Sequence, residues 1–179
     1  MTTIIRTATI AGALLLAFVP AASAKVIDQS ATGFTLVYEA DFTVEPKAAY
    51  DAFADSGSWW SKDHTYSHDA KNLTIDLRNG GCWCETLANG GFVRRMDVIH
   101  VVPGERLLFR GALGPLAFMG VAGSMRVTFE KKDKGAHVTM RYAIGGHDDD
   151  DFKTISKAVD EVLGEQFKRY SNFAATGKP

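Results

Sequence analysis

The C-terminal part of the sequence, roughly Asp150 to Ala174, has the pattern of one long amphipathic helix. Apolar side chains recur there at steps of three and four residues, which places them on one face of an α-helix. Charged residues fill most of the opposite face. The apolar set is Phe152, Ile155, Val159, Val162, Leu163, Phe167, Tyr170 and Phe173. A helix with such a stripe needs a surface to pack against, and the rest of the fold must supply it.

The aspartate run that precedes this helix, residues 148–151, resembles a cation site at first sight. Aspartate at a helix N-cap and in the first turn accepts hydrogen bonds from free N–H groups and suits the helix dipole. The run also lacks the alternating ligands of a calcium loop. We therefore expect it to cap the helix.

The segment from Phe34 to Gly145 supplies the packing surface as short alternating strands separated by turn signals. Seven strands are predicted, over residues 34–43, 73–78, 82–87, 92–102, 106–111, 125–129 and 138–144. After the first strand, a short helix is expected over residues 47–54, with a second short helical segment beyond it. Residues 113–123 are expected to form a glycine-rich loop. Tight turns such as Asn79-Gly80-Gly81 require antiparallel neighbours. The first strand is expected to pair with a later one. The predicted fold class is α+β.

Residues 1–24 have the organisation of a secretory signal: Arg6, then an apolar run broken at Pro20, then Ala22-Ser23-Ala24. We expect cleavage after Ala24 and a single mature domain over 25–179 with no membrane span, located outside the cytoplasm, in the periplasm. The full chain has a net charge of −1 and no basic stripe, which excludes nucleic acid as a partner.

The order of one strand, two short helices, six strands and a long helix resembles the helix-grip fold of the SRPBCC superfamily, which includes START domains and birch-pollen-allergen proteins. The residues 80–85 (Gly-Gly-Cys-Trp-Cys-Glu), Gly90-Gly91 and 103–107 (Pro-Gly-Glu-Arg-Leu) are similar to the branch of activator-of-heat-shock-ATPase homologues. The cysteines beside Trp83 and the loop 64–67 depart from that branch and resemble a smaller exported group. The resemblance implies a curved seven-stranded antiparallel sheet wrapped around the C-terminal helix, with a cavity between them. It also implies hydrophobic ligands, while some relatives are cyclases or aromatases and others are co-chaperone domains.

Cys82 and Cys84 are two residues apart on a predicted strand. An exported protein favours a disulfide, but two regular strand steps place the Cα atoms ~6.6–6.8 Å apart, at the far edge of the disulfide range. Bonding would need a local kink. Buried core thiols are the preferred interpretation, and a strained disulfide, a redox pair and soft-metal ligation with His64 and His68 stay open.

Several other side chains are candidates for a site. Trp59 and Trp60 either fill one end of the sheet–helix gap or border the cavity mouth, a position that the resemblance favours. Glu85 lies on the strand face opposite the cysteines, beside Trp83, and is expected to be solvent-facing or paired with an arginine rather than a general acid. Arg94, Met96, Val98 and His100 are placed on one face of their strand, with Arg95, Asp97 and Ile99 on the other.

We therefore predict an exported binding protein for a small hydrophobic or amphipathic molecule, with no cofactor and no metal. The predicted lining is Trp59, Trp60, Cys82, Cys84, Phe109, Phe118, Met140 and Phe167, with His64 and Tyr66 at the mouth. The alternatives are a cyclase- or hydrolase-type enzyme using His64, Glu85 or a low-pKa cysteine, and a protein-interaction module. Whether a reaction is catalysed, and the oligomeric state, are left open.

Overall fold

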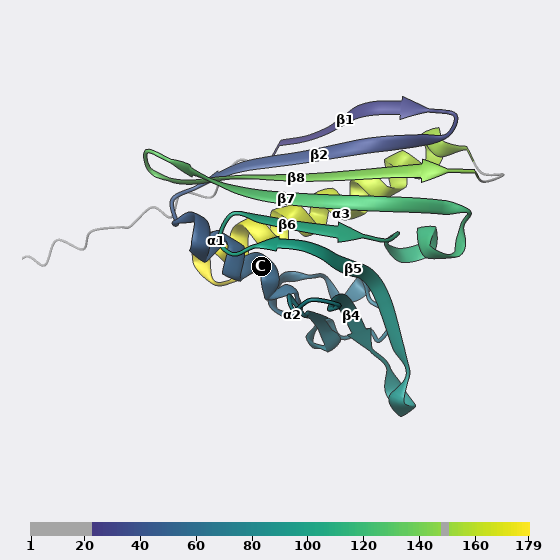
Figure 1. Ribbon diagram of the computed structural model, residues 1–179, viewed down its shortest axis with the longest axis horizontal. Helices are drawn as coiled ribbons and strands as arrows, with labels where there is room; N and C mark the ends of the chain where they lie inside the picture. The colour runs from purple at the N-terminus through teal and green to yellow at the C-terminus, as the bar shows by residue number, and fades with distance from the viewer. Residues whose placement is uncertain (1–22, 148–150) are drawn as a thin grey trace, which may run out of the picture.

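The computed structural model describes residues 23–147 and 151–179, and within them the chain forms an eight-stranded antiparallel sheet with a long helix across one face (Figure 1). The strands are β1 (Ser23–Ser30), β2 (Gly33–Phe42), β3 (Leu73–Ile75), β4 (Cys82–Thr86), β5 (Phe92–Val102), β6 (Arg106–Arg110), β7 (Val121–Lys132) and β8 (Gly135–Gly146). The helices are α1 (Pro46–Ala54), α2 (Ser56–Trp59) and α3 (Phe152–Thr176), and the 3-10 turns are η1 (Lys62–His64), η2 (Ala70–Asn72), η3 (Ala88–Gly90) and η4 (Gly114–Phe118).

The order of strands in the sheet is β1-β2-β8-β7-β6-β5-β4-β3. The first predicted strand, observed as β2, pairs with the last strand β8, as expected from the helical excursion that follows it. The α+β fold class and the two short helices are confirmed. The count of seven strands is wrong, because β1 forms a hairpin with β2 from residues that the sequence analysis had not assigned to a strand. Of the predicted signal segment 1–24, residues 1–22 lie outside the described residues.

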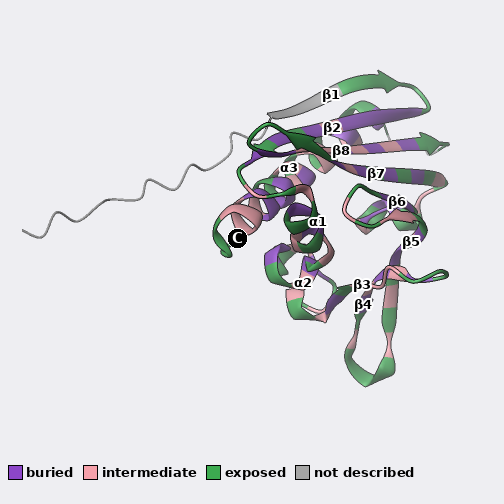
Figure 2. Ribbon diagram, turned by 60° about the vertical axis from the view of Figure 1, so that its left-hand side comes forward, coloured by how far each residue is buried: buried purple, intermediate pink, exposed green. Residues whose placement is uncertain are grey.

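A second correction concerns the segment 113–123, which was expected to be a loop. Its first half forms η4, but β7 begins at Val121 and pairs with the end of β8 at Gly146. The inward-facing residues of this strand are Gly123, Met125, Val127 and Phe129, so the alternating segment begins before the first large apolar side chain, Met125. Buried residues alternate with exposed ones along the central strands, so that one face of the sheet carries the core (Figure 2).

Helix α3 begins where the aspartate run predicts a cap. The Asp151 carboxylate accepts hydrogen bonds from the Lys153 backbone N–H at 3.1 Å and from the Thr154 hydroxyl at 3.1 Å. The other three aspartates, 148–150, lie outside the described residues. Gly177 ends the helix in a left-handed conformation at φ 74°, a backbone angle that glycine adopts at no steric cost.

The apolar stripe of α3 divides into two parts. Phe152, Leu163, Phe167 and Tyr170 are buried, whereas Ile155, Val159 and Val162 are only partly buried. Near the middle of the helix, a Cβ added at Gly164 would lie 3.7 Å from Cε1 of Tyr38, an ordinary van der Waals contact. The helix therefore touches the sheet at this point. Any open space must lie elsewhere along α3.

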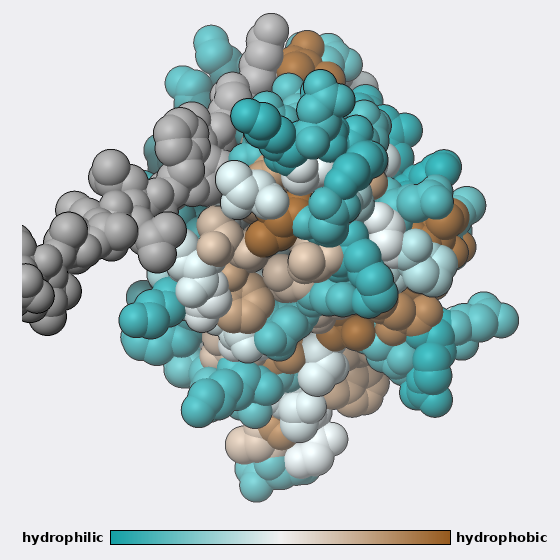
Figure 3. Space-filling model, turned by 90° about the vertical axis from the view of Figure 1, so that its left-hand side faces the viewer, coloured by the Kyte–Doolittle hydropathy of each residue, from teal (hydrophilic) through white to brown (hydrophobic). Residues whose placement is uncertain are grey.

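An aromatic cluster fills the gap between the sheet, α1 and the second half of α3. The ring of Phe53 lies with its centroid 5.4 Å from Trp59, 6.0 Å from Trp83, 6.4 Å from Phe109 and 5.2 Å from Tyr170. All five side chains are at most 1% exposed. Fully burying each ring contributes about 1.5–3 kcal/mol, so this end of the fold is a packed core. The surface at this end of the molecule intersperses hydrophilic and hydrophobic side chains (Figure 3).

Candidate functional site

A cavity of about 730 Å³ opens beside the first half of α3, at the other end of the sheet–helix gap. Its three walls come from α3, from the segment around η4 and from the segment around η1, with one residue of β5. The residues that line it are Trp60, Asp63, His64, Thr65, Tyr66, Arg95, Leu113, Gly114, Pro115, Leu116, Phe118, Met119, Ile155, Ala158, Val159, Val162 and Leu163. Most of these side chains are apolar, and the polar ones lie together on the η1 side.

The α3 wall consists of the less buried part of the helical stripe. Ile155, Val159 and Val162 follow one another at steps of four and three, with Ala158 beside them, so they form one surface along the helix. Packed side chains of the sheet cover the neighbouring part of the stripe, but they do not cover these residues completely. An amphipathic helix with a stripe wider than its packing partner leaves an apolar surface of this kind.

The opposite wall is the segment 113–119, which the Tyr142 side chain holds in place. The Leu113 backbone N–H donates to the Tyr142 hydroxyl at 2.9 Å. Burial raises the pKa of the Tyr142 hydroxyl, and this effect outweighs the hydrogen bond from Leu113, which lowers the pKa. From this anchor the chain turns through Gly114 at a positive φ of 58° into η4. Leu116 then points into the core, whereas Phe118 at the cavity is 84% exposed.

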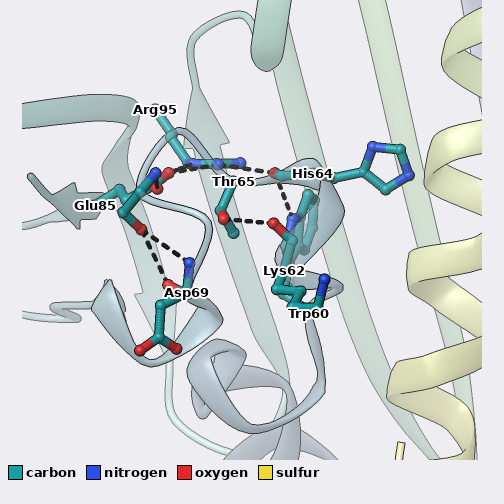
Figure 4. A network of polar contacts seen from close by, with 8 residues as sticks. Trp60, Lys62, His64, Thr65, Asp69, Glu85 and Arg95 are labelled. Carbon is teal, nitrogen blue, oxygen red and sulfur yellow. Dashed lines mark hydrogen bonds and ion pairs between the residues drawn. The ribbon is translucent and has the colours of Figure 1, made fainter.

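The polar end of the cavity is built around a buried ion pair between Arg95 and Glu85 (Figure 4). The Glu85 Oε2 atom accepts from Arg95 Nε at 3.0 Å and from Arg95 Nη2 at 2.6 Å. Arg95 Nη2 also donates to the His64 carbonyl at 3.0 Å, which accepts the Trp60 indole N–H at 2.9 Å as well. The guanidinium lies 5.5 Å from the ring centroids of both Trp60 and Tyr66, within the range of a cation–π contact. Arg95 thus fixes the segment around η1 against the sheet.

The Glu85 carboxylate is fully buried and has all its oxygens engaged. Its other oxygen, Oε1, accepts the Ser67 backbone N–H at 2.6 Å. Burial raises the pKa of Glu85, but the hydrogen bonds from Ser67 and Arg95 and the charge of Arg95 together outweigh burial and hold the pKa below its ordinary value. Glu85 is therefore an ionised acceptor at neutral pH. Such a carboxyl has no proton to give, which makes a general-acid role unsuitable.

A β-bulge in β5 turns Arg95 inward. Cys84 pairs with Arg94 and Trp83 pairs with Met96, so Arg95 is the extra residue of the bulge. Arg95 and Met96 are consecutive and both buried, which a regular strand cannot arrange, because successive side chains point to opposite faces. The alternation predicted for this strand, with Arg95 and Met96 on opposite faces, is therefore wrong at this point. A second irregularity lies between Val98 and His100.

The two cysteines form a disulfide directly across from this bulge. Cys82 and Cys84 are bonded, with Cα atoms 5.4 Å apart. The preferred expectation of free core thiols is wrong, because it assumed a regular strand with a longer spacing. The local kink that a bond between residues two apart requires is present, since β4 and β5 change register between Trp83 and Cys84. Cys82 and Cys84 are half-buried on the face opposite Trp83 and Glu85, which are both 0% exposed.

The segment around η1 is also fixed to α3. The Ser61 backbone N–H donates to Gln166 Oε1 at 2.8 Å, and Arg169 Nε donates to the Trp59 carbonyl at 2.8 Å. At the cavity mouth, His64 Nε2 lies 3.3 Å from Glu165 Oε2. These contacts hold the mouth without filling the cavity.

The structure brings four of the ten predicted lining residues to the cavity, namely Trp60, His64, Tyr66 and Phe118. Four others lie in the packed core and not at the cavity, namely Trp59, Phe109, Met140 and Phe167. Cys82 and Cys84 face away from it. Whether any of these residues binds a ligand stays a prediction. Sequence reasoning missed Arg95 and the wall residues Leu113, Leu116 and Met119. It placed Ile155, Val159 and Val162 on the helix beside the expected cavity but did not include them in the lining.

The described residues contain no group of three or more histidine, cysteine or acidic side chains that could hold a metal ion. The bonded cysteines also face the side of β4 away from the cavity, so the alternative of a mixed cysteine–histidine ligand set has no geometric basis. Across residues 23–147 and 151–179, no helix is long and apolar enough to cross a membrane.

No protein-family model and no curated protein matches the sequence. Solved structures do resemble the fold. An uncharacterised protein from Rhizobium leguminosarum is 15% identical with a TM-score of 0.57, over 88% of this chain and 98% of that one. CalU16 from Micromonospora echinospora is 12% identical with a TM-score of 0.52, over 89% and 84%. The di-domain ARO/CYC protein BexL is 14% identical with a TM-score of 0.55, over 84% and 52%. At these identities the likeness establishes the fold alone: the chain has a helix-grip fold, with an open antiparallel sheet around a long C-terminal helix.

Proposed function

We propose that the chain is an exported member of the SRPBCC superfamily that binds a small hydrophobic or amphipathic molecule. The observation that carries this proposal is the cavity of about 730 Å³, whose walls are apolar on two sides and polar on the third. Its volume falls within the range of ~300–1,000 Å³ that is usual for small-molecule sites. The proposed site lies beside the first half of α3, because the aromatic cluster closes the second half.

Burial of apolar surface would supply most of the affinity for such a ligand. Each Å² of apolar surface removed from water contributes about 25 cal/mol. The wall residues Ile155, Val159 and Val162 on α3, and Leu113 and Met119 opposite them, would provide that contact. The polar groups beside η1 would then fix the orientation of the ligand.

The test is a binding measurement with a bulky substitution in one wall. Nile red, an uncharged fluorescent dye, would be titrated into the protein, and native mass spectrometry would look for a co-purified ligand. Ala158→Trp places a large ring in the cavity and is expected to abolish dye binding. Lys157→Trp is the matched control, because Lys157 is exposed on the same helix and does not line the cavity. Absence of dye and ligand from the unmodified protein, or equal binding by both variants, would contradict the proposal.

A cyclase- or hydrolase-type enzyme is the second candidate, and the printed name of BexL is a reason to keep it. The structure narrows the residues that it could use. The cysteines are bonded and Glu85 has a lowered pKa, which leaves His64, with Glu165 beside its Nε2 atom. A positioned histidine–carboxylate pair at a cavity mouth is the arrangement of a general base with its orienting group.

Hydrolysis of p-nitrophenyl butyrate tests this candidate. A rate above that of buffer, lost in both His64→Ala and Ala158→Trp, would support an enzyme that uses the cavity. A rate equal to that of buffer would remove ester hydrolysis from consideration.

A protein-interaction module is less well supported. It would need a large apolar patch on the outer face of the sheet. The described part of the chain has five exposed large hydrophobic residues. Ile27 lies on β1, Tyr66 and Phe118 lie at the two sides of the cavity mouth, and Phe92 and Ile99 lie at two separate points of β5. They form no single patch on the sheet.

A further inference from the structure

The Arg95 side chain has more hydrogen-bond donors than the protein uses. A guanidinium carries five N–H groups, one on Nε and two on each Nη atom. Glu85 and the His64 carbonyl accept from Nε and Nη2 only. Within the described residues, no acceptor lies at hydrogen-bond distance and angle from Nη1, so both of its N–H groups are unpaired.

The Nη1 atom is nevertheless accessible. In the described part of the chain, four polar side-chain atoms are both fully buried and without a partner: Ser56 Oγ, Trp83 Nε1, Gln166 Nε2 and Asn172 Oδ1. Nη1 of Arg95 has no partner but is not among these atoms, so it is not fully buried. Arg95 as a whole is only 4% exposed, and it lines the cavity. The small exposed part of its side chain therefore faces the cavity. Because Nε and Nη2 share the edge that faces Glu85, Nη1 lies on the other side of the guanidinium.

The charges around this donor restrict the acceptor that it suits. Among the described residues that line the cavity, Arg95 alone has a permanent positive charge, and Glu85 already neutralises it. Asp63 in the lining is already paired with Lys62 at 2.7 Å, and the Glu165 carboxylate lies at the mouth beside His64, so no cation of the described lining is left without a partner. A ligand carboxylate would lose its hydration in an apolar cavity without a countercharge of its own. A pure hydrocarbon would leave two buried N–H groups without a partner.

We propose that the ligand carries an uncharged hydrogen-bond acceptor, a carbonyl or a hydroxyl oxygen, which accepts from Arg95 Nη1 while its apolar body lies along α3. This assignment rests on the proposed binding function and names the ligand class for it. The contacts of Arg95 with Trp60 and Tyr66, each at 5.5 Å, hold the guanidinium in place before the ligand arrives. The donor is therefore oriented in the empty site, which lowers the entropic cost of binding.

Three probes built on one dimethylaminonaphthalene ring system test the proposal. The ketone 6-propionyl-2-(dimethylamino)naphthalene offers a carbonyl, 6-propyl-2-(dimethylamino)naphthalene offers none, and 6-(dimethylamino)-2-naphthoate offers a carboxylate. Fluorescence titration is expected to give the ketone an affinity on the order of tenfold to a hundredfold above that of the other two, the range for a hydrogen bond to a charged group. Equal affinity of the ketone and the propyl compound, or strongest binding by the carboxylate, would overturn the assignment.

Removing both partners of the ion pair gives the second measurement. In the double variant Glu85→Gln with Arg95→Gln, the preference for the ketone is expected to disappear while the propyl compound still binds. Arg94→Gln is the control, because Arg94 lies on the opposite face, paired with Asp97. A ketone preference that survives in the double variant would also overturn the assignment. If that variant does not fold, the comparison of the three probes on the unmodified protein decides the question alone. Failure of all three probes to bind refutes the binding function itself, which separates the two proposals.

Discussion

Replacement of Arg95 by methionine removes one partner of the buried ion pair and leaves the other in place. The Glu85 side chain is 0% exposed and that of Arg95 is 3% exposed, so the carboxylate would keep only the Ser67 N–H at 2.6 Å. Breaking a buried pair from one side costs about 3–5 kcal/mol, because an uncompensated charge stays buried in the protein. For a domain of this size, each kcal/mol lowers the melting temperature by roughly 2–4 °C. We therefore expect the melting temperature of Arg95→Met to fall by about 6–20 °C.

A double-mutant cycle separates the charge from the packing. Glu85→Met alone should also destabilise, whereas Glu85→Met combined with Arg95→Met should recover most of the loss, because no charge then remains buried. Arg94→Met is the matched control, since its ion pair with Asp97 is exposed and worth about 0–1 kcal/mol. Urea unfolding at pH 7, followed by tryptophan fluorescence, would give the four free energies of unfolding. Additive losses in the double variant, or an Arg95→Met variant as stable as Arg94→Met, would refute this reasoning.

Three further outcomes are expected. The lowered pKa of Glu85 means that its stabilising contribution is complete above the ordinary carboxyl pKa of about 4.3 and is lost as the pH falls through its folded value. The urea midpoints of the unmodified protein and of Glu85→Gln, measured at successive pH values, should therefore converge in acid. A difference that stays constant with pH would contradict this. Replacing both Cys82 and Cys84 by alanine lets β4 lengthen opposite the bulge, so the Arg95 Nε–H resonance in NMR spectra should shift; an unchanged resonance would show that the bulge does not need the disulfide. Tyr170→Phe removes a hydrogen bond of 3.0 Å to a backbone carbonyl of α1 and should lower the free energy of unfolding by about 1 kcal/mol, measured by urea titration, and an unchanged midpoint would count against that bond.

Much of the fold follows from local patterns. The steps of three and four in α3, the alternation in seven strands and the turn at Asn79-Gly80-Gly81 each depend on neighbouring residues alone, and each was predicted correctly in kind. The position of α1 between β2 and the next strand predicted that β2 pairs with a later strand, and that strand is β8. The strand β1 was missed because its first two residues belong to the predicted signal segment and the others show little alternation.

The site was harder to predict, because it depends on departures from those patterns. Arg95 faces inward through a one-residue bulge, and no residue type in β5 marks where a bulge will fall. The disulfide coincides with an irregularity of the strand pairing, so a calculation from regular strand geometry favoured free thiols over it. The large aromatic residues were assigned to the cavity, but large residues close space as readily as they line it. Trp59, Phe109 and Phe167 close it, and the smaller residues Ile155 and Val159 border the remaining opening.

Strand β1 has a consequence for maturation of the chain. It is an outer strand of the sheet, and its first two residues, Ser23 and Ala24, precede the predicted cleavage point. Removal of residues 1–24 would therefore trim an edge strand and leave a free ammonium group at Lys25, opposite Val37 of β2. Unpaired edge strands attract other strands, and positive charge on such an edge opposes that association. If the predicted cleavage takes place, it therefore puts a positive charge on this edge of the sheet, where such a charge opposes edge-to-edge association.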